Sequence, residues 1–202
     1  FNTDTLIVAS VDPVNGTVTM FSIPRDTVDF PVPASAQRLY GATYGNKINS
    51  YYASAGRHPD VFPDGPMPAL REMLGNFYGM TIDYSLMVNF TGFQEIVDAL
   101  DGVRVTARNP VTDDSYPIGG GKYARIHVLA GVHAMDGAEA LIFARSRHGS
   151  SDFDRAARQQ QVISAIRAQS DMAAITRNLP SLAVALKDSL KSDFPQQDLP
   201  LL

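Results

Sequence analysis

The chain has 202 residues, a formal net charge of −4, 45% hydrophobic residues, and neither Cys nor Trp. This length and composition are typical of a single folded domain, and they exclude a disulfide scaffold, a cysteine-ligated zinc site and a thiol nucleophile. No apolar run approaches the roughly 20 residues that cross a bilayer, and an acidic isoelectric point of about 5.5 argues against general nucleic-acid binding.

The N-terminal part of the chain predicts a β-hairpin followed by two helices. Residues 5–11 and 17–23 alternate in hydrophobicity, and Asp12–Gly16 supplies the residues of a turn between them. Proline- and glycine-rich segments then surround two helical patterns, over 47–55 and 68–78.

The middle of the chain predicts a strand, a helix and a strand in succession. The strands cover 83–90 and 103–106, and the helix between them covers 91–100. A strand, helix, strand unit implies that the two strands pair in parallel. Residues 109–127 are expected to form a loop.

The C-terminal part predicts helices. Asp136 and Glu139 have the spacing of a capping box before a helix over 138–144. A longer helix begins at Ser151 or Asp152 and runs to about Met172, and a last helix covers 180–190. Helices that alternate with strands indicate an α/β fold in which helices flank a sheet.

An arginine-rich segment is the first candidate site. Residues 145–158 hold four Arg against two Asp. If the helix begins near Asp152, three polar side chains at positions i, i+3 and i+4 share one face near its N-terminus, where backbone N–H groups and the helix dipole favour anions. Surface pairing of Arg with Asp is the alternative. The candidate anion-binding residues are Arg145, Arg147, Arg155, Arg158 and Gln159.

A second candidate site lies at the open end of the predicted hairpin. The pair Arg25 and Asp26 follows the second strand, and Asp4 precedes the first. If the hairpin pairs in register, Asp4 and Arg25 lie near one another. Lys47 follows the long loop and is expected to return to the same edge. The alternative is a strand-terminal ion pair of small energetic value, under about 1 kcal/mol.

Two other motifs are weak. Residues 119–122, Gly-Gly-Gly-Lys, resemble the end of a phosphate-binding loop, but Tyr123 stands where Ser or Thr is needed, so a loop tip is the better interpretation. The triplet Arg147-His148-Gly149 is similar to that of the histidine phosphatases, but no His follows His148, so this class is rejected.

Taken in order, the motifs closely resemble those of the LytR-CpsA-Psr family of bacterial cell-wall phosphotransferases. The resemblance runs from Asp4 to about Ala168. The motifs that carry it are Asp4-Thr5, Ile23-Pro24-Arg25-Asp26, Lys47-Ile48-Asn49, Ile82-Asp83-Tyr84, the segment 90–102, Ala144-Arg145-Ser146-Arg147 and Asp154-Arg155-Ala156-Ala157-Arg158-Gln159-Gln160.

The resemblance implies an α/β/α sandwich with a mostly mixed central sheet. It implies one catalytic domain over residues 1–192, whose first strand is missing upstream, and a C-terminal tail over 193–202. The implied enzyme is bacterial and extracytoplasmic, is anchored to the cytoplasmic membrane by an upstream N-terminal helix, and binds no nucleic acid. It transfers a glycopolymer such as teichoic acid or capsule, with one phosphate, from a polyprenyl pyrophosphate carrier to a sugar hydroxyl of peptidoglycan.

The resemblance also implies roles for individual residues. The catalytic set is Arg25, Arg145, Arg147, Arg155 and Asp154, the last of these orienting Arg155. The set that contacts the pyrophosphate is Arg25, Lys47, Arg145, Arg147, Arg155, Arg158 and Gln159. Asp4 would help to hold Mg²⁺. Asn2 departs from the family pattern, which has Arg there, and the strand that carries a second metal-binding Asp is absent.

Three further expectations concern function and the apolar residues. One alternative function is a polyprenyl pyrophosphate phosphatase, and another is a module that binds a lipid-linked glycan without turnover. The family encloses its lipid in a long apolar pocket. For the apolar residues that could line such a pocket, taken one by one, ordinary core is the expected role: Met87, Phe90, Phe93, Ile96 and Leu141.

Overall fold

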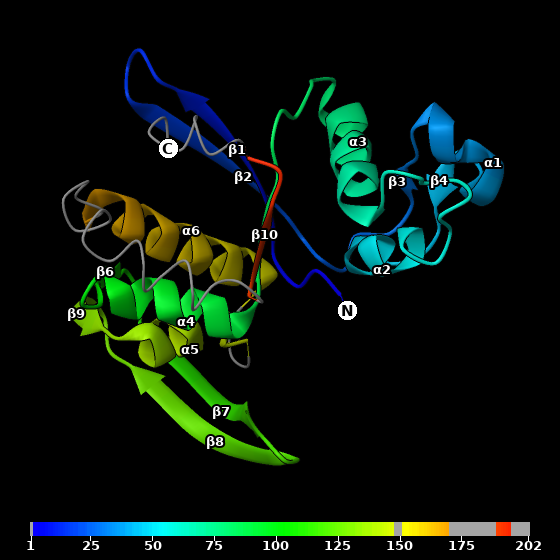
Figure 1. The fold of residues 1–202 in the computed structure, drawn as a ribbon. Coiled ribbons are helices and arrows are strands. Elements are labelled where there is room, and N and C mark those ends of the chain that lie inside the picture. The colour runs from blue at the N-terminus through cyan, green and yellow to red at the C-terminus, as the bar shows by residue number, and fades with distance from the viewer. Residues whose placement is uncertain (1, 148–150, 170–188, 195–202) are drawn as a thin grey trace. The chain divides into compact units, whose positions relative to one another are not determined.

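The computed structural model describes residues 2–147, 151–169 and 189–194 (Figure 1). The chain forms two compact units: residues 1–86 with 192–202, and residues 87–191. We refer to them as the first and the second unit. Their helices and strands place the chain in the α/β class, as predicted.

The first unit opens with the predicted hairpin. Strands β1 (Leu6–Asp12) and β2 (Thr17–Ile23) pair antiparallel along their whole length, from Leu6 opposite Ile23 to Asp12 opposite Thr17. At the turn, the Asp12 carboxylate accepts hydrogen bonds from the backbone N–H groups of Val14 and Asn15, at 2.9 and 3.1 Å. The turn chemistry read from the sequence therefore sets the register of the ladder.

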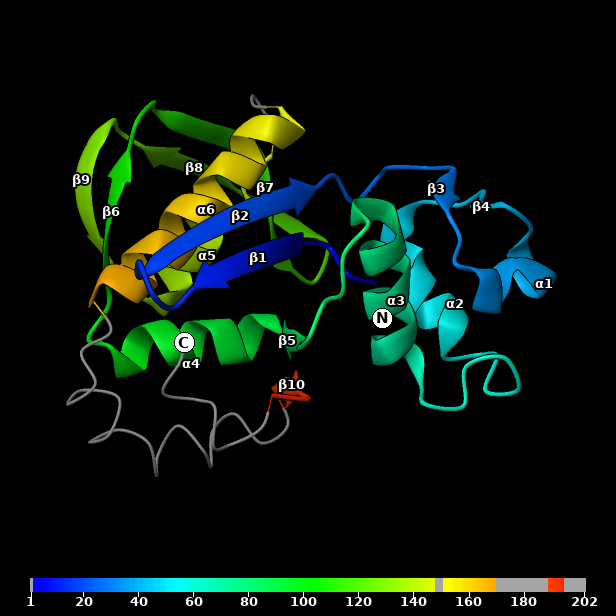
Figure 2. The same ribbon diagram turned by 90° about the horizontal axis from the view of Figure 1, so that it is seen from above.

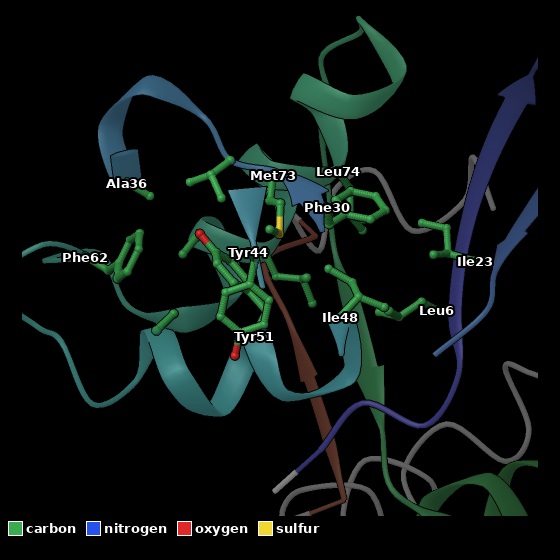
Figure 3. Close-up of a cluster of buried hydrophobic side chains, with 14 of the residues drawn as sticks. Leu6, Ile23, Phe30, Ala36, Tyr44, Ile48, Tyr51, Phe62, Met73 and Leu74 are labelled. Atoms are coloured by element: carbon green, nitrogen blue, oxygen red, sulfur yellow. The ribbon is translucent and has the colours of Figure 1, made fainter. Parts of the chain in front are cut away.

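The rest of the first unit is built from short elements around an aromatic core. The predicted helix over 47–55 is a 3₁₀ turn (Ile48–Ser50) that leads into α2, and the helix predicted over 68–78 begins two residues earlier. Large side chains of this core, among them Tyr44, Tyr51 and Met73, converge in Figure 3. The elements are β3 (Phe30–Pro31), a 3₁₀ turn (Ala34–Ala36), α1 (Gln37–Tyr40), β4 (Thr43–Tyr44), which pairs with β3, α2 (Tyr51–Ala55) and α3 (Pro66–Tyr78).

In its described residues, the second unit packs three helices with two antiparallel ladders (Figure 2). Its core contains Val97, Val103, Phe143 and Val162, which are almost fully buried. The elements are α4 (Phe90–Ala99), β6 (Val103–Ala107) paired with β9 (Gly131–Met135), β7 (Val111–Gly119) paired with β8 (Lys122–Val128), α5 (Gly137–Arg145) and α6 (Asp152–Gln169). Two short strands at the boundary of the units, β5 (Leu86–Val88) and β10 (Leu190–Ser192), pair with each other.

Helix caps in the second unit follow the sequence. Asp136 and Glu139 form the predicted capping box, each side chain accepting from the other residue's backbone N–H, at 2.8 and 3.1 Å. The Asn89 side chain caps α4 by accepting from the backbone of Gly92 at 2.8 Å. Gly137, the first residue of α5, lies so close to α4 that an added Cβ would be 2.4 Å from the carbonyl oxygen of Gln94.

Two predictions of secondary structure are wrong. The strands expected to form a parallel pair do not pair among the described residues, because β6 is hydrogen-bonded to β9 and β5 to β10. Residues 109–127 are not a loop: they hold β7 and most of β8. The turn between these strands uses three consecutive glycines with positive φ, Gly119 to Gly121, so the weak phosphate-loop motif is a hairpin turn.

The described residues after β10 belong to the first unit and are bonded within it. The Asp193 carboxylate is ion-paired with Arg71 and accepts from the backbone and hydroxyl of Ser85. Although burial raises it, the pKa of the Asp193 carboxyl is lowered below its ordinary value by the Ser85 hydrogen bonds and the charge of Arg71. Residues 195–202, residues 170–172 of the predicted long helix and residues 180–188 of the predicted last helix lie outside the described residues, and Leu190 belongs to β10.

Candidate functional site

The open end of the β1–β2 hairpin gathers the predicted residues of the first unit into one cluster. Continuing the ladder two positions past the Leu6 and Ile23 pair puts Asp4 opposite Arg25, and Arg25 Nη1 donates to Asp4 Oδ1 at 2.6 Å. Lys47 also reaches this end, where its Nζ lies 3.0 Å from Asp26 Oδ1. We call Asp4, Arg25, Asp26 and Lys47 the Arg25 cluster.

Backbone hydrogen bonds hold the segment that carries Lys47 against the hairpin end. The N–H of Ile48 donates to the carbonyl of Thr27 at 2.8 Å, and the N–H of Asn49 donates to that of Arg25 at 3.2 Å. The carbonyl of Asn49 in turn accepts from the N–H of Thr3 at 2.9 Å. The predicted return of Lys47 to this edge is therefore confirmed, and it rests on backbone pairing.

The Arg25 guanidinium has a donor without a hydrogen-bond acceptor. Its Nε is buried and makes no hydrogen bond to the part of the chain that the structure describes, and the Asp26 carboxylate lies 3.9 Å away. A buried polar group without a partner is costly, by about 1–3 kcal/mol. A ligand oxygen that accepts from Nε would remove this cost, so the cluster is suited to an anion such as phosphate.

In the second unit, Arg145 lies between two aromatic side chains. Its guanidinium carbon is 4.0 Å from the centre of the Phe90 ring and 5.7 Å from that of Tyr116, and its Nη1 donates to the Tyr116 hydroxyl at 3.4 Å. A cation over an aromatic face is attracted to it and loses rotational freedom. Phe90, expected as core, is 46% exposed and instead supports this arginine.

Asp152, at the start of α6, lies between two of the predicted arginines. Its Oδ1 is 3.5 Å from Arg147 Nη2 and 3.3 Å from Arg155 Nη2. The side chain of Arg155 is only 8% exposed, whereas that of Arg147 is 40% exposed. One carboxylate thus brings the two guanidinium groups to the same helix end.

Arg158 points its donors at the end of the preceding helix. It is 6% exposed, its Nε donates to the carbonyl of Phe143 at 3.0 Å, and its Nη2 donates to that of Ser146. Burial lowers the pKa of the Arg158 guanidinium, and the nearby Asp154 carboxylate opposes this. These contacts favour a positioning role for Arg158, because its guanidinium satisfies the last carbonyls of α5.

The buried carboxylate of Asp113 holds the same turn from its other side. Asp113 is 1% exposed, and its Oδ2 accepts from the backbone N–H of Arg147 at 2.9 Å. The carbonyl of Ser146 is bound by Arg158 and the next N–H by Asp113, so the peptide between Ser146 and Arg147 is fixed at both polar ends.

Asp154 caps the helix on which it lies. Its Oδ2 accepts from the N–H and the hydroxyl of Ser151, at 2.9 and 2.7 Å, and the Ser151 hydroxyl accepts from the Asp154 N–H at 3.1 Å. The Ser151 hydroxyl lowers the pKa of the Asp154 carboxyl. The carboxylate of Asp152 lies beside Arg155, and the orienting role expected for Asp154 stays a prediction. Gln159 donates to the Ala144 carbonyl at 3.5 Å.

The structure therefore brings the predicted residues together within each unit. Four contacts lie outside the prediction: Phe90, Tyr116, Asp113 and Asp152. The contact of Asp152 with the arginines could be predicted from its position two residues before Asp154. The other three contacts have no signal in the local sequence, and Asp113 and Tyr116 lie in a segment that is predicted to be a loop. We call Arg145, Arg147, Arg155, Arg158 and Gln159 the Arg145 cluster.

A divalent cation would need ligands beyond the protein. No group of three His, Cys, Asp or Glu side chains within the described ranges could hold a metal ion. The Arg25 cluster offers two carboxylates, Asp4 and Asp26, and the Asp4 side chain is 46% exposed. Mg²⁺ is commonly bound by one or two carboxylates together with substrate phosphates. The residues present thus fit a magnesium ion only when phosphate oxygens complete its coordination.

The fold and the two arginine clusters define an α/β protein whose polar groups are suited to phosphate-bearing ligands. A model of the LytR_cpsA_psr family matches residues 1–201, and the chain belongs to this family. The resemblance read from the motifs is thereby confirmed.

Named relatives agree with this assignment. The chain is 30% identical over 193 residues to the polyisoprenyl-teichoic acid–peptidoglycan teichoic acid transferase TagU of Halalkalibacterium halodurans, covering 95% of the chain and 55% of TagU. It is 32% identical over 165 residues to TagU of Bacillus subtilis, covering 81% of the chain and 45% of the relative. The regulatory protein MsrR of Staphylococcus aureus is 30% identical over 200 residues, which cover 98% of the chain and 53% of MsrR. The chain spans about half the length of these relatives.

Solved structures share the fold. The crystal structure of B. subtilis TagV superposes with a TM-score of 0.71 at 26% identity, covering 99% of the chain and 70% of TagV. A structure of TagT bound to LI-WTA superposes with a TM-score of 0.68 at 25% identity, covering 98% of the chain and 66% of TagT. In the described residues, no helix is both long and apolar enough to cross a membrane.

Proposed function

We propose that the chain is the catalytic domain of a phosphotransferase. It moves a glycopolymer with one phosphate from a polyprenyl pyrophosphate carrier to a sugar hydroxyl of peptidoglycan, outside the cytoplasmic membrane to which the carrier belongs. The observation that carries this proposal is the Arg25 cluster, in which a buried guanidinium nitrogen lacks an acceptor. Family membership and the names of the relatives, which include teichoic acid transferases, support it.

The reaction is a substitution at phosphorus. The acceptor hydroxyl oxygen bonds to the phosphorus that carries the glycan, the bond from that phosphorus to the bridging oxygen breaks, and polyprenyl monophosphate leaves with the electron pair. The hydroxyl proton passes to water. Such a transfer needs positioning and charge neutralisation more than covalent help from the protein.

The arginines supply both needs. Arg25 is held by Asp4 at 2.6 Å, and its Nε has no hydrogen-bond acceptor among the described residues. In the second unit, Arg145 is held by two aromatic rings, and Arg147 and Arg155 by Asp152. Because these guanidinium groups are oriented before the ligand binds, little rotational freedom is lost as charge develops on the phosphoryl oxygens.

A magnesium ion fits this proposal at Asp4. When bound there, it would neutralise charge on the pyrophosphate oxygens. Asp26 is ion-paired with Lys47, whose Nζ lies 3.0 Å from its Oδ1. We therefore expect turnover to depend on Mg²⁺ and to fall when a chelator is added.

One reaction mixture separates the proposal from its two alternatives. The chain is incubated with a polyprenyl pyrophosphate glycan, Mg²⁺ and peptidoglycan. Glycan linked to peptidoglycan supports the transferase. Free phosphate without linked glycan indicates a pyrophosphatase, and bound but unchanged substrate indicates a binding module.

The variant series tests the observation that carries the proposal. Arg25→Ala is expected to lower turnover by about 100-fold, the usual effect of removing one such donor. Arg25→Lys keeps the charge but has no donor at the position of Nε, so it is expected to recover only part of the loss. The matched control is Arg38→Ala, which removes an exposed arginine of the same unit and should leave turnover unchanged. Unchanged turnover in Arg25→Ala would refute the site.

A further inference from the structure

The tip of the β7–β8 hairpin is exposed and apolar. Ile118 is 58% exposed and Tyr123 is 65% exposed, and they flank the three-glycine turn. In Figure 1 the hairpin extends away from the helices of its unit. The two strands bond to each other, and no other described strand pairs with them. Large apolar side chains that the described part of the unit leaves more than half exposed are candidates for contact with a lipid surface or another molecule.

The charge of the tip is positive. Between residues 115 and 124 the only charged side chain is Lys122, which is exposed. The next charges along the strands, Asp114 and Arg125, neutralise each other at 2.8 Å. An isoleucine, a tyrosine and a lysine at one turn have the chemistry of a lipid interface, where apolar groups insert, a phenol lies at headgroup level and an amine meets anionic phosphates.

The tip is joined directly to the Arg145 cluster. Tyr116 is buried at 6% exposure, and its hydroxyl accepts from Arg145 at 3.4 Å. Ile118 follows two residues later, about 7 Å further along the strand at roughly 3.3 Å per residue. The lipid tail and the pyrophosphate of a polyprenyl carrier are directly bonded, so a protein that takes this carrier from a membrane brings its arginines to the membrane surface.

We infer that the β7–β8 tip, formed by Ile118, Lys122 and Tyr123, contacts the surface of an anionic lipid bilayer and so holds Arg145 at headgroup level. This inference rests on the proposed function, because that function gives the reason for Arg145 to approach a membrane. The contact itself is a property of the hairpin and does not require turnover.

The absence of Trp from the sequence permits a direct measurement. Tyr123→Trp places a single indole at the tip, and its emission is recorded with vesicles of equal parts phosphatidylglycerol and phosphatidylcholine. The matched control is Val14→Trp, at the tip of the other hairpin, where Val14 is 89% exposed and Asp12 supplies a negative charge. We expect a blue shift, and quenching by brominated lipid, for Tyr123→Trp but not for Val14→Trp.

Vesicle sedimentation measures the strength of the contact in the full chain. The double variant Ile118→Ser, Tyr123→Ser is expected to lower partitioning at least tenfold, since each side chain loses its apolar burial. Lys122→Glu is expected to lower partitioning to the anionic vesicles about tenfold and to leave that to pure phosphatidylcholine unchanged. Equal partitioning of all variants would overturn the inference. A blue shift of Tyr123→Trp that occurs without lipid at high protein concentration would also overturn it, because such a shift indicates contact with a second copy of the chain.

A water-soluble short-chain pyrophosphate substrate separates the two proposals. The tip variants are expected to turn it over at the rate of the parent chain, because no membrane is involved. Turnover of this substrate by a parent chain that does not bind vesicles would overturn the membrane contact alone. Vesicle binding by a chain that turns over no substrate would overturn the proposed function alone.

Discussion

Replacing Arg158 with methionine tests whether this buried arginine holds the end of α5. Methionine keeps the unbranched stem but removes the donors to Phe143 at 3.0 Å and to Ser146. A hydrogen bond from a charged donor contributes about 1.5–3 kcal/mol. Two such bonds give a loss of about 3–6 kcal/mol, and removing a buried charge returns part of it. We expect the free energy of unfolding to fall by about 3 kcal/mol.

Urea unfolding followed by circular dichroism gives this free energy, and hydrogen exchange measured by mass spectrometry locates the change. The exchange of α5 and of the start of α6 should increase most. Arg167→Met is the matched control, because Arg167 lies on the same helix but is exposed, and it should change stability by no more than about 0.5 kcal/mol. A loss below about 1 kcal/mol for Arg158→Met, or faster exchange only in the first unit, would refute the reasoning.

Three further substitutions address packing, pH and the site. Gly137→Ala should lower the free energy of unfolding by about 2–3 kcal/mol in thermal melts, because its Cβ would lie 2.4 Å from the Gln94 carbonyl oxygen. Asp193→Asn should make the free energy of unfolding decline less steeply at acid pH. The pKa of Asp193 is lowered in the folded state, so the Asp193 carboxylate stabilises the fold above its unfolded pKa of about 4. This stabilisation is lost as the pH falls through the folded pKa. Phe90→Leu should lower turnover about threefold, because Arg145 loses the ring 4.0 Å away.

The glycine and phenylalanine predictions have control variants, and Asp193→Asn is compared with the parent chain. Gly56→Ala should be nearly neutral, since the closest atom to its Cβ would be at an ordinary 3.6 Å, and an equal effect of both glycine variants would contradict the packing argument. Urea midpoints of Asp193→Asn that fall with acid as steeply as those of the parent chain would contradict the pH argument. Phe90→Tyr keeps an aromatic face and should retain the turnover of the parent chain. Equal turnover of Phe90→Tyr and Phe90→Leu would contradict a role for the aromatic face.

The local features of the fold were predictable because their causes are local. The β1–β2 register follows from the turn at residues 13–16, and this register places Asp4 beside Arg25. The capping box of α5 follows from the spacing of Asp136 and Glu139. In each case the residues that make the contact are close in sequence, or are brought together by one ladder.

The errors concern partners distant in sequence. Strand β6 pairs with β9, which lies more than twenty residues further along the chain. The residues Val103–Ala107 do not indicate which strand will form hydrogen bonds with their backbone groups. The sequence predicts a loop for the β7–β8 hairpin because the alternation is interrupted where the register shifts between Asp113 and Tyr116. Since Tyr116 and Asp113 lie there, the supports of Arg145 and Arg147 were missed with it.

The antiparallel ladder of β1 and β2 has a consequence for residues far from the site. Seven paired positions separate the turn at residues 13–16 from the end where Asp4 meets Arg25. A deletion of one residue in that turn would shift the pairing register by one and turn every side chain of the shifted strand to the opposite face. The exposed residues Pro13 to Gly16 touch no phosphate-binding group, yet they determine which carboxylate the arginine meets, so selection on the site extends to this distant turn.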